Sequence, residues 1–422
     1  MRNLLKISTI LIMTITVFSC SKEDEVITPD PIQVATLSSI SPKSGKKGTT
    51  VTINGTNFGT NQNSVSVFFN DKPALVQSVT DTEITVIVPI GALTGFIKVI
   101  VDGTELTGPE FTYVFTVDVS TLAGSTQGFA DGVGSAAKFF VPRGITTDSF
   151  GNIYVADRVN IRIRKITPDG TVSTIAGNGS TGFQDGEGIN ATFFGVEQVA
   201  TDKFDNIYIT DQSVGYIRKI SAGSGIVSTI ATGLIVPRGI VVDDSGIIYV
   251  ADFHKLLKID LNGTISTLAG GDDAGFADGI GTDAKFEGLT SLTIDASGII
   301  YGADFQNHRI RKITSSGEVS TVAGSTLGFA DGAAISALFN SPTSITVDPA
   351  GNLFVVDSEN HRIRKITPDG EVSTVAGSTQ GFADGNGTVA QFDFPKAITI
   401  DVDGNLYITD TNNHNIRKIT LE

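Results

Sequence analysis

The sequence predicts an all-β protein in which a small β domain precedes a six-bladed β-propeller. One observation is a pattern, PTSITVDPAGNLFVVDSENHRIRKITPDGEVSTVAG at residues 342–377, that recurs in varied form between residues 116 and 422. Each copy contains four short runs of alternating apolar and polar residues, divided by Asp-Gly or Gly-Asn. One Asp per copy recurs at spacings of 52 to 54 residues, with a single spacing of 41: Asp157, Asp211, Asp252, Asp304, Asp357 and Asp410. A four-stranded unit repeated six times is typical of a β-propeller.

The first complete copy shows how one unit is built. Its expected strands cover residues 144–148, 153–157, 161–167 and 171–177, and short polar turns join them. The last copy ends the chain without a fourth strand, whereas residues 116–124 contain an extra STLAG. We therefore expect segment 116–124 to form the outer strand of the final blade, which closes the ring and removes an open sheet edge.

The first 20 residues resemble a bacterial lipoprotein signal peptide. Arg2 and Lys6 precede a short apolar run, and the segment VFSC that ends at Cys20 is similar to a lipobox, in which the cysteine carries the lipid. Cys20 is the one cysteine in the sequence, so no disulfide can form within the chain. An ordinary signal peptide with an incidental cysteine is the alternative.

A polar linker is expected at residues 21–34. Its first residues, SKEDE, resemble the surface-export signal of Bacteroidota lipoproteins, and a solvated spacer is the alternative. These features predict a lipid-anchored outer-membrane protein exposed at the cell surface. They leave open whether the protein faces the exterior or the periplasm.

Residues 35–115 resemble the IPT/TIG family, whose members are immunoglobulin-like β-sandwiches. The likeness lies in SPKSG at 41–45, in Gly48 and in GTNFG at 55–59. The Gly and Asn residues of NGTNFG at 54–59 suit a tight turn that needs a positive φ, which explains them structurally and assigns them no chemistry. The resemblance implies a spacer or interaction module.

Residues 116–422 resemble the NHL family, which is named for an Asn-His pair. That pair occurs in NHRIRKI at 307–313 and 360–366 and in NHNIRKI at 413–419. The resemblance implies a six-bladed propeller, and it is weaker in the third blade, where DFHKLLKID replaces the motif. Since His308, His361 and His414 occupy the same repeat position, we interpret them as parts of a turn. His254 is out of register with them.

Enzymatic relatives of this architecture suggest a second function. Amidating lyases and gluconolactonase-like hydrolases with six blades hold metal ions at the central channel. The six repeated Asp residues could line the channel mouth and attract a cation. The alternative is that each Asp ends a strand and accepts hydrogen bonds from the next turn. Since the sequence has no HExxH or nucleophile-elbow motif, we expect an enzyme less than a binding protein.

The connections between blades carry a second repeat. GFADGVGSAAKF at 128–139 recurs before every blade except the third, where TGLIVPRG at 232–239 is much shorter. Each copy has an Asp before Gly, flanked by Phe residues such as Phe129 and Phe139 that we expect to pack the loop onto the blades. We expect no cofactor, because each loop has few carboxylates and the calcium-repeat spacing is absent. Calcium is the alternative considered.

The shortened connection interrupts an otherwise regular rim. Beside it, the sequence places four residues that break the repeat: Tyr216, Phe253, His254 and Lys255. We predict that a unique binding groove, if the propeller has one, includes these residues.

The composition limits the partners. Acidic residues outnumber basic residues by 45 to 30, and the net charge of −15 argues against nucleic acid or an anionic membrane surface. The sequence has no Trp, and five of its seven Tyr share one position of the repeat, so few aromatic residues remain for sugar stacking. The prediction is a non-catalytic binding module for a surface protein or a glycan, without an obligate oligomer. The alternative is a metal-assisted lyase or hydrolase at the channel.

Overall fold

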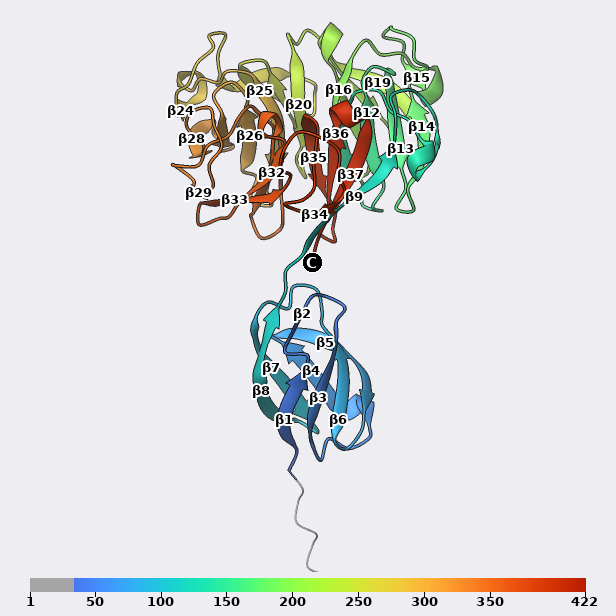
Figure 1. Ribbon diagram of the computed structural model, residues 1–422. Helices are drawn as coiled ribbons and strands as arrows, with labels where there is room; N and C mark the ends of the chain where they lie inside the picture. Colours follow the sequence, from blue (N-terminus) through green and yellow to red (C-terminus); the bar gives the residue numbers. More distant parts are fainter. Residues whose placement is uncertain (1–33) are drawn as a thin grey trace, which may run out of the picture. The chain divides into compact units, whose positions relative to one another are not determined.

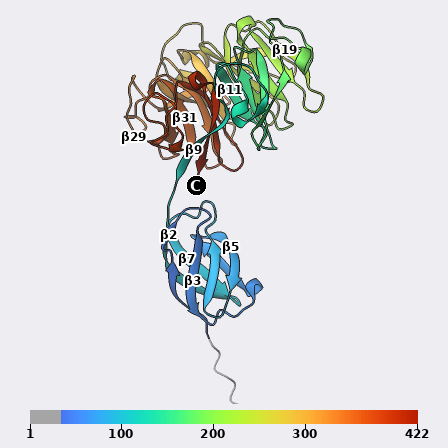
Figure 2. The same cartoon turned by 45° about the vertical axis from the view of Figure 1, so that its right-hand side comes forward.

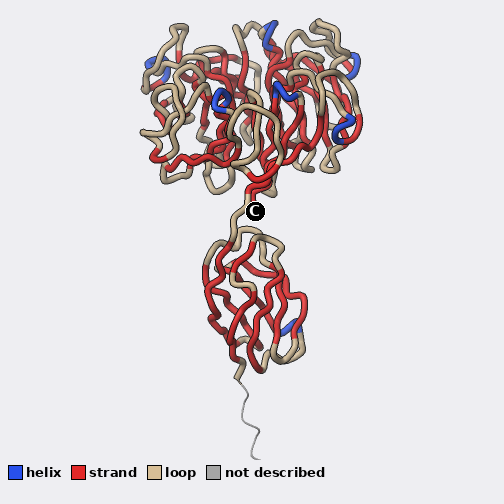
Figure 3. The backbone as a smooth tube through the Cα atoms, viewed as in Figure 1, coloured by secondary structure: helices blue, strands red, loops and turns tan. Residues whose placement is uncertain are grey.

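The computed structural model describes residues 34–422 and divides them into two compact units, up to Tyr113 and from Val114. Strands make up most of both units, and the helical segments are single 3₁₀ turns (Figure 3). The predicted signal peptide, Cys20 and nearly all of the predicted linker lie outside the described residues. The 3₁₀ turns are η1 (Gln62–Ser64), η2 (Gly134–Ala136), η3 (Gly188–Asn190), η4 (Gln212–Val214), η5 (Gly281–Asp283), η6 (Ser358–Asn360) and η7 (Thr411–Asn413).

The first unit is an immunoglobulin-like β-sandwich. Its strands pair in the order β1-β3-β6-β5-β4-β7-β8-β2, so β5 belongs to both layers. Phe58, Phe69 and Phe111 fill the core between the layers, and the last two rings meet edge to face at 4.9 Å. The strands are β1 (Thr36–Ser41), β2 (Ser44–Gly45), β3 (Thr50–Thr56), β4 (Val65–Phe69), β5 (Lys72–Val79), β6 (Glu83–Ile87), β7 (Gly95–Val101) and β8 (Thr104–Tyr113).

The second unit is the predicted six-bladed β-propeller (Figure 1). The innermost strands are β11 (Pro142–Thr147), β16 (Val196–Thr201), β20 (Pro237–Val242), β25 (Leu289–Ile294), β30 (Pro342–Val347) and β35 (Pro395–Ile400). The second strands are β12 (Ile153–Asp157), β17 (Ile207–Asp211), β21 (Ile248–Asp252), β26 (Ile300–Asp304), β31 (Leu353–Asp357) and β36 (Leu406–Asp410). The third strands are β13 (Arg162–Ile166), β18 (Tyr216–Ile220), β22 (Lys255–Ile259), β27 (Arg309–Ile313), β32 (Arg362–Ile366) and β37 (Asn415–Leu421).

The outer part of each blade comes partly from the connections. The fourth strands are β14 (Thr171–Ala176), β19 (Ile226–Ala231), β23 (Ile265–Gly270), β28 (Glu318–Ala323), β33 (Glu371–Ala376) and β9 (Val117–Gly124). The long connections add two-residue fifth strands, namely β10 (Gly132–Val133), β15 (Gly186–Glu187), β24 (Gly279–Ile280), β29 (Gly332–Ala333) and β34 (Gly385–Asn386). The third blade has four strands, because its connection is too short to provide a fifth.

The ring closes as the sequence predicts. Strand β9 pairs with β37 along its whole length, so residues from the two ends of the propeller segment share the last blade (Figures 1 and 2). Neighbouring blades are held together by apolar side chains. For example, Ala156 and Ile163 of the first blade pack with Val199 and Ile209 of the second. Phe193 from the connection completes the same cluster, so burial of apolar area couples each blade to the next.

Candidate functional site

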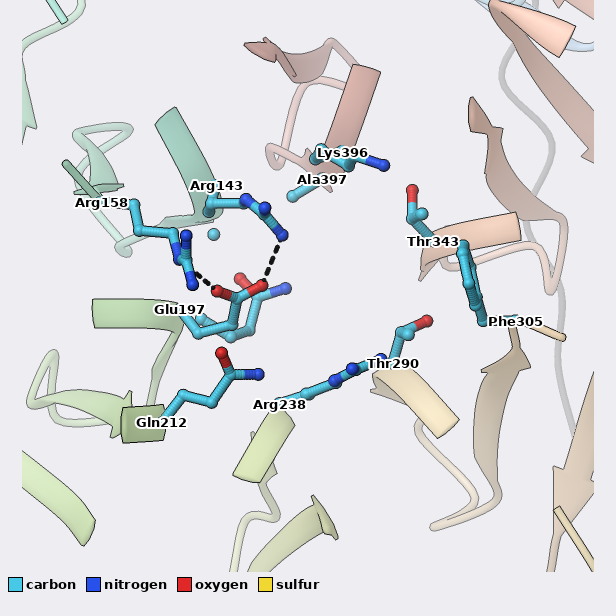
Figure 4. A pocket seen from close by; sticks show the side chains of 12 residues that line it. Arg143, Arg158, Glu197, Gln212, Arg238, Thr290, Phe305, Thr343, Lys396 and Ala397 are labelled. Carbon is cyan, nitrogen blue, oxygen red and sulfur yellow. Dashed lines mark hydrogen bonds and ion pairs between the residues drawn. The ribbon is translucent and has the colours of Figure 1, made fainter. Parts of the chain in front are cut away.

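One position in each blade faces the mouth of the central channel. It is the second residue of each innermost strand, and it belongs to the cavity lining in every blade: Arg143, Glu197, Arg238, Thr290, Thr343 and Lys396. The turns after the second strands add Arg158, Gln212 and Phe305. Together these groups line a cavity of about 290 Å³ (Figure 4). The site thus lies at the end of the channel where the long connections enter the blades.

The mouth is basic although the chain is acidic. Four of its side chains are cations and one is a carboxylate, whereas the whole sequence carries a net charge of −15. The Glu197 carboxylate bridges two of the cations, at 2.9 Å from Arg143 Nη1 and 2.9 Å from Arg158 Nε (Figure 4). Since one carboxylate cannot neutralise four cations, the mouth keeps an excess of positive charge.

Arg238 and Lys396 are the cations that Glu197 does not hold. The Lys396 ammonium donates a hydrogen bond to Ser358 Oγ at 3.2 Å, and burial followed by the nearby charge of Arg143 lowers its pKa. Burial also lowers the pKa of Arg238, with contributions from the charges of Arg143 and Arg158. A guanidinium nevertheless stays protonated in a protein. Within residues 34–422, no hydrogen bond or ion pair engages the Arg238 guanidinium.

The other side of the mouth is neutral. Thr290, Thr343 and Phe305 lie together across the opening from Arg158 and Glu197 (Figure 4). Thr290 Oγ1 donates to the Ala303 carbonyl at 3.2 Å. The hydroxyl of Thr343 is buried and has no partner within the described chain, which is an uncommon state for a buried polar atom.

The six repeated Asp residues are buried, and five of them are paired with arginine. Asp157 Oδ2 lies 2.7 Å from Arg164 Nη1, and the same arginine reaches Asp131 of the connection at 2.6 Å. We call this arrangement the Asp–Arg–Asp clasp. The equivalent clasps are Asp211–Arg218–Asp185, Asp304–Arg311–Asp278, Asp357–Arg364–Asp331 and Asp410–Arg417–Asp384.

The clasp joins three parts of a blade. The Arg164 guanidinium also donates to the carbonyls of Lys138 and Ala130, and Asp131 accepts from Thr174 of the fourth strand. One buried arginine thus connects a strand end, an outer strand and the connection. The third blade has Leu257 at the arginine position and lacks the loop Asp, and there Asp252 accepts from the backbone N–H groups of Ile235 and Val236.

The carboxylates of the clasps are engaged by protein donors. Burial raises the pKa of Asp410 to about 6, and hydrogen bonds from Asn413, the Asp393 N–H and Arg417 oppose the rise. Within residues 34–422, no group of three or more His, Cys, Asp or Glu is placed to hold a metal ion. A cation at the Asp ring therefore stays an untested prediction.

The buried arginines and the channel-mouth ring were not among the site residues predicted from the sequence. A signal for the clasp was present, since the arginine and the loop Asp are both missing from the third copy. The mouth had no such signal, because the second residue of each innermost strand varies between copies and so do its two neighbours. The two Phe residues expected to pack the connection onto the blade both contact it. Phe139 is buried, and Phe129, although 47% exposed, lies against the guanidinium groups of Arg162 and Arg164 of the third strand, at 3.9 and 4.9 Å.

The repeated histidines join one blade to the next. Nδ1 of His308, His361 and His414 accepts the backbone N–H of Ser341, Phe394 and Val141, respectively, at 3.0 to 3.3 Å. Burial lowers the pKa of all three imidazoles, which favours the neutral form that can accept a hydrogen bond.

His254 makes the same contact despite its shifted register. Its Nδ1 accepts the N–H of Gly288 in the next blade at 3.2 Å. The turn of the third blade is shorter, and Phe253 adopts the positive φ that a histidine adopts in the last three blades. His254 therefore belongs to the contact between blades, and its place in a binding groove stays an untested prediction.

The other predicted binding residues do not line the mouth. Phe253 is 40% exposed and its ring lies against that of His254, at 3.7 Å between centroids. Lys255 pairs with Asp272 at 2.5 Å, and Tyr216 begins the third strand of the second blade. Phe253 follows Asp252 as Phe305 follows Asp304, yet only Phe305 belongs to the cavity lining. A groove beside the short connection stays an untested prediction.

The described chain matches two family models. The IPT/TIG domain model matches residues 35–115, and the teneurin NHL domain model matches residues 312–420. Teneurin-4 of Mus musculus is 28% identical over 356 residues, covering 70% of this chain and 12% of teneurin-4. NHL repeat-containing protein 2 of Homo sapiens is 28% identical over 321 residues, covering 72% of this chain and 42% of that protein. The chain thus spans less than half the length of these relatives.

Solved structures share the two-domain fold. A protein of unknown function from Bacteroides thetaiotaomicron has a TM-score of 0.72 and 26% identity, over 93% of this chain and 99% of that one. An auxiliary nutrient binding protein from Bacteroides ovatus has a TM-score of 0.62 and 21% identity, with the same coverage.

The fold and these matches define a protein class, a six-bladed β-propeller preceded in the chain by an immunoglobulin-like domain. More narrowly, the protein is an NHL-type β-propeller with an N-terminal IPT/TIG domain. Within residues 34–422, no helix is long and apolar enough to span a membrane.

Proposed function

We propose that this protein is a non-catalytic binding protein whose ligand occupies the channel-mouth cavity. One observation carries the proposal. The clasp recurs in five of the six blades because it holds the connection to the blade, whereas the channel-facing position is Arg, Glu, Arg, Thr, Thr and Lys in the six blades. A scaffold that needs the same contact in every blade favours the same residue, and an asymmetric ligand requires different ones. A concave cavity is the usual form of a small-ligand site.

One further point agrees with a binding role. Proteins that share this fold at 21% identity are described as auxiliary nutrient binding proteins from Bacteroides species. That likeness concerns the fold alone, so the proposal rests on the mouth.

A substitution that fills the mouth tests this function. We expect a ligand identified from a panel of sugars, sugar acids and organic acids to bind the wild type and Thr290→Ser, but not Thr290→Trp. The indole would occupy the cavity, whereas serine keeps the hydroxyl and its hydrogen bond to Ala303. Melting curves would show whether both variants fold. A ligand that binds Thr290→Trp as tightly as the wild type would place the site elsewhere.

We also propose that Cys20 carries the lipid that anchors the protein in the outer membrane, with the propeller at the cell surface. The proposal rests on the lipobox-like segment and the acidic residues that follow it. Labelling cells with radioactive palmitate should mark the wild type and not Cys20→Ala. Protease treatment of intact cells should remove the protein if it is exposed at the surface.

A further inference from the structure

The charges of the mouth are distributed unevenly around the ring. Four consecutive blades place Lys396, Arg143, Glu197 and Arg238 at the mouth, and the next two blades place Thr290 and Thr343 there. Given the proposed binding function, we infer that the ligand is a sugar acid or a similar hydroxy acid. Its acid group binds Arg238, and its neutral hydroxylated body lies along Thr290, Thr343 and Phe305.

Arg238 is the cation of the mouth whose donors are all available to a ligand. The Glu197 carboxylate holds Arg143 and Arg158, and Lys396 donates one hydrogen bond to the neutral Ser358 hydroxyl. The Arg238 side chain extends toward Thr290 and has no bonded partner within residues 34–422 (Figure 4). Its planar set of donors suits an acid group bound through two parallel hydrogen bonds.

The remaining cations attract an anion without needing to contact it. Arg143, Arg158 and Lys396 lie around the same cavity, which is partly enclosed, so their charges are screened less than on an open surface. Charges of one sign in a cleft raise the local concentration of the opposite ion. A neutral ligand would gain nothing from this field.

The neutral side specifies the rest of the ligand. The Thr343 hydroxyl is buried without a partner, and a ligand hydroxyl would satisfy it. Phe305 offers the one aromatic ring of the lining, on which the apolar face of a sugar ring can pack. The volume of about 290 Å³ lies at the small end of the range for small-molecule sites, which favours a monomer or a chain end.

Titration calorimetry with D-glucuronate, D-glucose and inorganic sulfate tests the inference on the full chain. We expect glucuronate to bind more tightly than both other probes, because glucose lacks the acid group and sulfate lacks the hydroxylated ring. Arg238→Gln should weaken glucuronate binding about 10- to 100-fold, the loss of a charged hydrogen-bond partner. It should leave the affinity for glucose unchanged.

Lys203→Gln is the matched control, since it removes one positive charge at an exposed residue that does not line the mouth. It should bind glucuronate like the wild type. Thr343→Val should weaken glucuronate and glucose alike, because it removes only the hydroxyl.

Several results would overturn the inference. Equal affinities for glucuronate and glucose, or an unchanged glucuronate affinity in Arg238→Gln, would show that Arg238 does not bind the acid group. Equal affinities for glucuronate and sulfate would show that the hydroxylated body of the ligand adds nothing to binding. No saturable glucuronate binding would refute it as well. If a different ligand then binds the wild type but not Thr290→Trp, the proposed binding function stands and only the inferred ligand class is wrong. If that ligand still binds Thr290→Trp, the binding site itself is misplaced.

Discussion

Replacing Arg311 by Leu removes the centre of one Asp–Arg–Asp clasp. The Arg311 guanidinium is fully buried and lies 2.6 Å from Asp304 and 2.8 Å from Asp278. It also donates to the carbonyls of Lys285 and Ala277, at 3.0 and 2.8 Å. Leu is the informative choice, because the third blade has Leu257 at this position and still folds around it.

The cost follows from what the substitution leaves behind. Breaking a buried ion pair by removing one partner costs about 3–5 kcal/mol, since the other charge stays buried. Asp304 would keep two donors, the Glu287 N–H and the Asn307 amide. Burial already raises its pKa, and losing Arg311 raises that pKa further. Because a raised pKa favours the folded state at low pH, the loss of stability should be larger at pH 8 than at pH 5.5.

Urea unfolding followed by circular dichroism measures the change in the free energy of unfolding. Lys312→Gln on the same strand is the control and should stay within about 0.5 kcal/mol of the wild type. Adding Asp304→Asn to Arg311→Leu should recover part of the loss, because the buried charge is then gone. A free energy of unfolding for Arg311→Leu within about 1 kcal/mol of the wild type would contradict the role assigned to the clasp.

Three further predictions concern other parts of the propeller. His361→Asn should lower the free energy of unfolding by about 1 kcal/mol at pH 8 and by less at pH 5. Because the pKa of His361 is lowered in the folded protein, its stabilising contribution is present above the ordinary pKa of 6.5 and is lost as the pH falls below that value. Equal costs at both pH values would contradict this. Glu197→Gln releases two guanidinium groups and should tighten sulfate or glucuronate binding about fivefold in calorimetry, whereas unchanged affinity would place the anion outside the mouth. A chain of residues 114–422 should elute as a folded monomer in size-exclusion chromatography, and a chain of residues 125–422 should aggregate, because β37 loses its partner β9.

Much of the fold could be predicted from local patterns. The alternation of apolar and polar residues, the Asp-Gly turns and the repeat length act within about 50 residues, so they are visible along the chain. The closure was predictable as well, because a missing fourth strand at one end matched an extra one at the other. These features determined the number of blades, the strands in them and the break at the third blade.

The tertiary structure decided what the repeated residues do. The hydrogen-bond partner of His254 is 34 residues away, in the next blade. In the sequence His254 is out of register with the other histidines, yet in the structure it makes the same contact between blades as they do. Arg164 joins groups that are 7 and 33 residues away, which no local pattern reveals.

The candidate site depends on still longer distances. Its channel-facing residues come from all six blades, and they meet only because the ring closes. The sequence determined which residue stands at each of these positions. The distances between side chains of neighbouring blades decided that Arg238 is unpaired. Glu197 lies close enough to Arg143 and Arg158 to bridge them, and it does not bond to Arg238.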